Sequence, residues 1–198
     1  SEMCIRDSFM IGMHSAGMAA VGKHFPGHGG VVEDSHKALP VDPRDLEALE
    51  SRDLLPFRTL MGHGLEGVMP AHVIYSALDS QPAGFSSFWI QEVLRSRLGF
   101  DGAVFSDDLS MAGAAFAGGY PERAERALDA GCDMVLVCNA PGAADEVLDS
   151  LIGRPEDPLR AKRLDRFRGR THFDRAHLDA NPAYQSLSAR LSRLASKS

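Results

Sequence analysis

Four times along the chain, a stretch with helical spacing of apolar residues leads into a short apolar strand and then a polar loop. The strands are expected at residues 21–25, 67–69, 102–106 and 134–138. Strands separated by helices of this length need crossover connections, so they should form a parallel sheet. Because the strands are continuously apolar rather than alternating, both faces of the sheet are expected to be covered. The fold class is therefore α/β, either a doubly wound sheet or a (β/α) barrel.

The helices are expected at residues 9–21, 46–61, 86–98, 121–130 and 143–151. The second helix follows Asp42-Pro43, where Asp can cap a helix and Pro fits its first turn. Gly99 and Gly131 follow the third and fourth helices, as glycine commonly does at a helix end. Beyond Pro155 the alternation stops, and two further helices are expected, at residues 159–168 and 173–194.

Polar side chains stand at or just after the end of each expected strand. They are Lys23 and His24, then His72, then Asp107 and Asp108, and finally Asn139. In a (β/α)8 barrel this end of the strands carries the active site, so we predict a TIM-barrel type. No GxGxxG follows the first strand, and a dinucleotide site therefore has little support.

The first cluster of chemically active residues runs from Lys23 to His36 and includes His24 and His28. Asp34 and His36 are two positions apart, so in an extended segment they point the same way and the carboxylate can orient the imidazole. Such a histidine can act as a general acid and base near neutral pH. The alternative is a turn capped by Asp34 with exposed histidines.

The second cluster is Asp107-Asp108, two carboxylates at the end of an apolar strand. In a strand they point to opposite sides, so one can face a ligand as a nucleophile while the other binds the frame. The alternative is that either of them caps the next helix. His72 either lines the pocket or is a buried structural histidine, and the sequence leaves both possibilities open.

Composition excludes several classes of protein. With 44% hydrophobic and 24% charged residues the chain is an ordinary globular sequence, and no apolar run approaches the ~18 residues of a membrane helix. Three cysteines without CxxC spacing indicate neither a disulfide framework nor a zinc site. From Arg154 onward there are 11 Lys and Arg against 5 Asp and Glu, whereas the residues before it carry 10 against 22. An acidic body argues against nucleic acid as a partner, and we expect the basic tail to be a solvated helical face.

Five motifs in this order resemble one family: KHFPGHG (23–29), DSH (34–36), MPAHVIYS (69–76), GFDGAVFSDDLSM (99–111) and AGCDMVLVCN (130–139). Together they closely resemble the bacterial β-N-acetylglucosaminidases of glycoside hydrolase family 3. The resemblance runs from about residue 9 to residue 151. Within that family, the sequence is similar to the cytoplasmic enzymes of peptidoglycan recycling, which remove terminal non-reducing β-N-acetylglucosamine from muropeptides.

The resemblance implies a role for each matching residue. Asp107 matches the nucleophile of a retaining mechanism, His36 the general acid/base and Asp34 its orienting partner. Lys23 and His24 match residues that hydrogen-bond the sugar hydroxyls, and we add His72 as a substrate-binding candidate. A histidine acid/base departs from the usual pair of carboxylates. No metal and no organic cofactor are implied, and the expected partner is a carbohydrate of the GlcNAc–anhydroMurNAc type, with no nucleic acid and no membrane.

Family members carry a first half of the barrel before the KHFPGHG strand, and a full barrel typically needs ~250 residues. The 198 residues are therefore expected to hold only the C-terminal half, about four βα units. We expect a non-native or unstructured start at residues 1–8, the half barrel at 9–155 and a helical tail at 156–198. The full-length protein is expected to be a cytoplasmic monomer and this chain alone nearly inactive.

Three alternatives stay open. One is a related family 3 β-glycosidase or glycoside phosphorylase, and another is a non-catalytic fragment. The third is a metal-dependent barrel hydrolase that uses His24, His28, His36 and Asp107, although no HxH or HExxH spacing supports it.

Overall fold

The computed structural model describes residues 2–31, 33, 35, 38–169 and 174–195. It divides into two compact units, Ser1–Arg168 and Gly169–Ser198, and each is described by itself. In the second unit the described helices are α7 (Arg175–Ala180) and α8 (Pro182–Ala195). Leu187, Leu191 and Leu194 of α8 are exposed.

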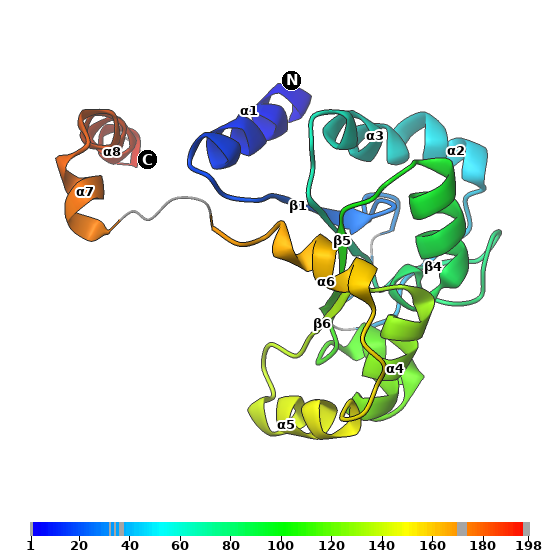
Figure 1. The fold of residues 1–198 in the computed structure, drawn as a ribbon. Coiled ribbons are helices and arrows are strands. Elements are labelled where there is room, and N and C mark those ends of the chain that lie inside the picture. The colour runs from blue at the N-terminus through cyan, green and yellow to red at the C-terminus, as the bar shows by residue number, and fades with distance from the viewer. Residues whose placement is uncertain (1, 32, 34, 36–37, 170–173, 196–198) are drawn as a thin grey trace. The chain divides into compact units, whose positions relative to one another are not determined.

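A parallel sheet lies at the centre of the first unit (Figure 1). Its strands pair in the order β1-β3-β5-β6, and every neighbouring pair is parallel. They are β1 (Val21–Phe25), β3 (Gly67–Pro70), β5 (Ala103–Asp108) and β6 (Met134–Leu136). The predicted α/β class, the strands and their parallel arrangement are confirmed. All four strands therefore end on the same side, which brings their last residues together.

Helices separate the strands along the chain, as crossover connections require. Between β1 and β3 lie α2 (Leu46–Arg52) and α3 (Leu54–Gly62), and between β5 and β6 lies α4 (Tyr120–Ala130). The remaining helical segments are α1 (Glu2–Ser15), η1 (Ala83–Phe85), the π-helical η2 (Phe88–Arg97), η3 (Ala112–Ala117), α5 (Pro141–Ser150) and α6 (Pro158–Asp165). A second sheet pairs β2 (Val41–Asp42) with β4 (Ile74–Tyr75) in parallel, which the sequence did not predict.

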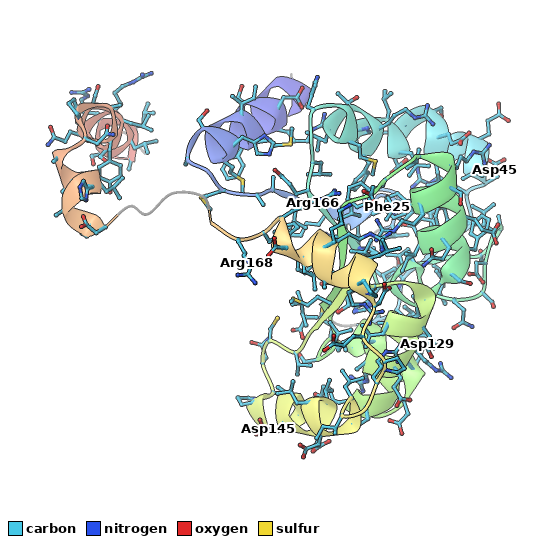
Figure 2. All side chains as sticks on the ribbon, in the orientation of Figure 1. Phe25, Asp45, Asp129, Asp145, Arg166 and Arg168 are labelled. Carbon is cyan, nitrogen blue, oxygen red and sulfur yellow. The ribbon has the colours of Figure 1, made fainter. Side chains whose placement is uncertain are left out.

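The expected helix over residues 46–61 is two helices, and its expected cap is wrong. Asp45, not Asp42, caps α2 by accepting the Ala48 N–H at 2.9 Å, and Figure 2 labels it at that helix end. Pro56 explains the split, because in one continuous helix it would remove a hydrogen bond and clash with the preceding turn. Within α3 it stands in the first turn, where it is tolerated.

The start of the chain also differs from expectation. Residues 2–8 belong to α1, so they are helical rather than unstructured, whereas the expectation that they are non-native stays a prediction. Near the other end of α1, His14 Nε2 lies 3.0 Å from Glu66 Oε2, just before β3. The same carboxylate oxygen accepts the Ala20 N–H at 2.9 Å. Glu66 thus anchors both the helix and the entry to β1.

Helix α6 belongs to the first unit, so the boundary expected at residue 155 falls instead after Arg168. Arg166, labelled in Figure 2, donates to Asp101 at 2.9 Å, and the Phe167 ring meets Phe105 of β5 edge-on at 4.9 Å. Arg163 reaches Asp133 Oδ1 at 3.2 Å. These contacts pack α6 against the sheet.

An aromatic core supports the end of β1. Phe25, labelled within the body of the unit in Figure 2, has no exposed surface. Its ring meets Phe57 of α3 at 5.3 Å and Trp89 of η2 at 6.1 Å, both edge-on, and Trp89 meets Tyr75 at 4.9 Å. Such edge-to-face contacts add to the burial of large apolar rings. They fix the strand end where Lys23 and His24 stand.

Candidate active site

Asp107 is a nearly buried carboxylate at the end of β5, with 7% of its surface exposed. Its Oδ1 accepts the backbone N–H of Asp108 at 2.9 Å. Its Oδ2 lies 3.8 Å from Nε2 of His24, which belongs to β1. The carboxylate is therefore held in one orientation, with its second oxygen turned toward His24.

The neighbouring Asp108 has a different role. Its carboxylate accepts the Ser110 N–H at 2.9 Å, the Ser110 hydroxyl at 2.6 Å, the Cys138 N–H at 3.0 Å and the Asn139 amide at 3.1 Å. Burial raises the pKa of Asp108, but these hydrogen bonds outweigh it and hold that pKa below its usual value. Asp108 thus ties the end of β5 to the segment after β6, as expected for an acid that binds the frame. Asn139, a pocket candidate from the sequence, is part of this tie. The role of Asp107 as the nucleophile stays a prediction.

The loop after β1 brings His28 next to His24, with ring centroids 6.2 Å apart in an edge arrangement. His28 Nε2 pairs with the Ser35 hydroxyl at 3.0 Å, and the Ser35 carbonyl accepts the Gly113 N–H of η3 at 3.3 Å. Ser35 is buried and lies close to the residues that follow β5. The predicted pair Asp34 and His36 lies outside the described residues, so its role stays a prediction.

A charged cluster that sequence reasoning missed supports this loop. Arg44 donates to both carboxylate oxygens of Asp42 and, at 2.7 Å, to Asp53. The loop backbone passes directly over it, since a Cβ added to Gly30 would stand 2.1 Å from Arg44 Nη2. A Cβ on Gly27 would meet Asp53 at 2.6 Å, and its positive φ of 148° also favours glycine. The two glycines were the available signal, because each allows a close backbone approach.

Comparison with known proteins decides the family. The family profile described as "Glycosyl hydrolase family 3 N terminal domain" matches residues 3–164. This chain belongs to glycosyl hydrolase family 3. The family 3 match covers the four-stranded sheet and the acids Asp107 and Asp108. It also covers the loop between β1 and β2 that carries His28, which we call the histidine loop.

Curated family 3 relatives are named beta-hexosaminidase. The one from Methylococcus capsulatus is 56% identical over 179 residues, which is 90% of this chain and 54% of the relative. That from Thiobacillus denitrificans is 62% identical over 160 residues, 81% of this chain and 44% of the relative. This chain thus spans about half the length of the curated relatives it matches.

Among solved structures, NagZ from Neisseria gonorrhoeae in complex with N-trifluoroacetyl-D-glucosamine superposes with a TM-score of 0.81 at 42% identity. The match covers 93% of this chain and 52% of NagZ. It confirms the predicted TIM-barrel type, of which this family 3 chain is a part.

The two remaining sugar-binding candidates of the family 3 chain differ in exposure. Lys23 is exposed on β1 and free to meet a ligand. His72 has no exposed surface, so in this conformation it cannot touch a substrate as expected. Its Nε2 lies 3.2 Å from the backbone oxygen of Asp108, and its ring stacks on Phe85 at 5.3 Å. This is the structural alternative that the sequence left open.

A cavity of about 810 Å³ in the first unit is lined by neither Asp107 nor Asp108. It lies beside α1, β1 and α3 and is largely apolar, with Phe9, Met10, Met13, Phe57 and Leu60 among its lining. Lys23, His24 and His28 line it too, whereas Asp107 does not. We place the chemistry at the strand ends, because an apolar wall offers few partners to sugar hydroxyls. Within the described part of the chain, no three His, Cys, Asp or Glu side chains come together as a metal site.

Proposed function

We propose that the chain carries the catalytic residues of a retaining exo-β-N-acetylglucosaminidase. The main support for the proposal is the setting of Asp107. It is a nearly buried carboxylate at the end of β5, oriented by the Asp108 N–H and facing His24. The chain that carries it belongs to family 3 and has relatives named beta-hexosaminidase. A carboxylate in this setting is suited to attack a sugar carbon.

In the first proposed step, an Asp107 oxygen attacks the anomeric carbon as the bond to the leaving oxygen breaks. His36, oriented by Asp34, gives its proton to that oxygen, and a glycosyl ester forms on Asp107. In the second step, water gives a proton to His36 and attacks the anomeric carbon, which releases Asp107 and the β-anomer. Two inversions leave the product with the starting configuration.

Lys23 and His24 are proposed to hydrogen-bond the hydroxyls of the sugar. Lys23 is exposed and His24 half-buried, so both can meet a ligand that reaches Asp107. The complex of NagZ with N-trifluoroacetyl-D-glucosamine supports an N-acetylglucosamine unit as substrate. We further propose that the natural substrates are peptidoglycan-derived muropeptides of the GlcNAc–anhydroMurNAc type, that the enzyme acts in the cytoplasm and that the full-length protein is a monomer. None of the described helices is long and apolar enough to cross a membrane.

The proposal is tested with 4-nitrophenyl β-N-acetylglucosaminide. The chain is assayed alone and co-expressed with the part of the Methylococcus capsulatus relative that it leaves unmatched, and NMR follows the anomer formed first. We expect the β-anomer from the co-expressed form and little turnover from the chain alone, where β1 and β6 are the edge strands of the sheet. First-formed α-anomer would contradict the retaining mechanism.

Two additions separate the alternatives in the same assay. Inorganic phosphate gives a sugar phosphate only if the enzyme is a phosphorylase. EDTA leaves turnover unchanged if Asp107 and His36 perform the chemistry, and abolishes it if a metal ion does.

A further inference from the structure

His72 is a buried histidine that the proposed chemistry does not use. It follows β3, and its ring lies parallel to that of Phe85, with an interplanar angle of 13°. Space around the residue is tight, since His72 has no exposed surface and a Cβ added to Gly113 would stand 2.9 Å from His72 Cβ. The stack and this enclosure leave the imidazole little freedom to move.

The hydrogen bond of His72 determines its tautomer. Its Nε2 lies 3.2 Å from the backbone oxygen of Asp108, and a carbonyl oxygen only accepts, so Nε2 carries the proton. Within the described residues, Nδ1 is buried without a hydrogen-bond partner. Burial lowers the pKa of His72, although the nearby charge of Asp107 acts to raise it. The lowered pKa favours the neutral ring.

The residue that His72 holds is also the one that orients the nucleophile. Asp108 receives the His72 N–H on its carbonyl oxygen and donates its own N–H to Oδ1 of Asp107. We propose that His72 is a positioning residue, which fixes the backbone of Asp108 and thereby the carboxylate of Asp107 for attack. This inference rests on the proposed function, in which Asp107 is the nucleophile.

Two substitutions of matched chemistry separate the hydrogen bond from the shape of the ring. The amide nitrogen of His72→Gln can reach the place of Nε2, whereas that of His72→Asn reaches only the place of Nδ1. Both remove the stack on Phe85. A role in packing alone therefore predicts equal effects, and a positioning role predicts that Gln rescues what Asn loses.

The first readout uses the chain by itself and needs no activity. Amide hydrogen exchange measured by NMR reports on the Asp108 N–H, with the Val68 amide of β3 as an internal reference. We expect His72→Asn to speed exchange at Asp108 about tenfold while Val68 changes little, and His72→Gln to resemble the wild type. Equal protection of Asp108 in all three proteins would overturn the proposal.

The second readout is the rate at which 5-fluoro-N-acetylglucosaminyl fluoride labels Asp107 in the co-expressed form. We expect His72→Asn to slow labelling and kcat about 10- to 100-fold with KM little changed, since small displacements of a reacting group carry costs of this size. His72→Gln should stay within about threefold of wild type, with thermal unfolding measured for both variants. Equal losses in both variants would overturn the proposal. A wild type that labels no residue would instead overturn the proposed function, and the exchange experiment then tests only whether His72 holds the backbone of Asp108.

Discussion

His24 Nε2 and Asp107 Oδ2 lie 3.8 Å apart, although they stand on strands that are separated by β3. The contact arises because β1, β3 and β5 are parallel and end on the same side of the sheet. His24 is one residue before the buried Phe25, and Asp107 is one residue before Asp108, which closes β5. A sugar held beside His24 would therefore meet the carboxylate of Asp107.

Substituting the two adjacent acids should separate catalysis from stability. Asp107→Asn should lower kcat by about 10³-fold or more, because an amide cannot form the glycosyl ester. It should change the unfolding free energy little, since its carboxylate accepts only one described backbone hydrogen bond. Asp108→Ala should instead cost about 1–3 kcal/mol of stability by leaving the Ser110 and Cys138 N–H groups without their acceptor. Urea unfolding and aryl glycoside turnover measure the two effects, and the reverse pattern would assign the nucleophile to Asp108.

Adjacent glycines of the histidine loop should respond differently to alanine. In Gly30→Ala the new methyl group would overlap Arg44, which is held by Asp42 and Asp53, so the loop must move. We expect a loss of kcat of about tenfold or more, because the loop carries the proposed acid/base. Gly29→Ala is the matched control, since nothing lies within 4 Å of its added Cβ. Similar kinetics of the two variants would show that the loop does not depend on the Arg44 cluster.

The buried ion cluster under α6 should matter more for stability than any exposed acid. Asp133 is 4% exposed and accepts from Arg95 at 2.8 Å, from Arg163 at 3.2 Å and from the Val104 N–H at 2.8 Å. Asp133→Ala should cost about 3–5 kcal/mol, because two arginines lose their buried counter-charge. Asp145→Ala, on the exposed side of α5 in Figure 2, should stay within about 0.5 kcal/mol. Equal urea midpoints would mean that α6 is not held by this cluster.

The buried His72 should make stability depend on pH below neutrality. Its folded-state pKa is lowered by burial, so below about pH 6.5 the unfolded chain binds more protons than the folded one. The contribution of His72 is thus complete above that pH and is lost as the pH falls toward the folded-state pKa. Relative to His72→Gln, the wild type should lose up to about 1.4 kcal/mol of unfolding free energy per pH unit. Urea unfolding at about pH 7 and pH 5.5 measures the unfolding free energy of both proteins. If both lose the same amount between these two pH values, His72 is solvated in the folded protein and the prediction is wrong.

The strands and the strand-end acids were predictable because their signals are local. The apolar runs that end at Pro26, Pro70 and Asp107 mark where each strand stops, whatever packs around them. The two-residue strands β2 and β4 carry no such run, and only the folded chain brings them together.

The burial of individual side chains and the contacts between residues far apart in the chain could not be predicted from the sequence. His72 follows β3 and Lys23 lies within β1, yet His72 is fully buried with its ring stacked on Phe85, whereas Lys23 is exposed. The Arg44 cluster likewise depends on Asp53, which lies between α2 and α3 and accepts from Arg44 at 2.7 Å. Asp34 and His36 remain predictions from spacing and resemblance.

The most direct test of the central proposal is to locate the trapped sugar. The co-expressed protein is labelled with 5-fluoro-N-acetylglucosaminyl fluoride, digested and mapped by tandem mass spectrometry. We predict one glycosyl group per chain, on Asp107, and none in Asp107→Asn. A label on Asp108 or any other residue, or turnover of the reagent without a label on Asp107, would contradict the assignment of Asp107 as the nucleophile.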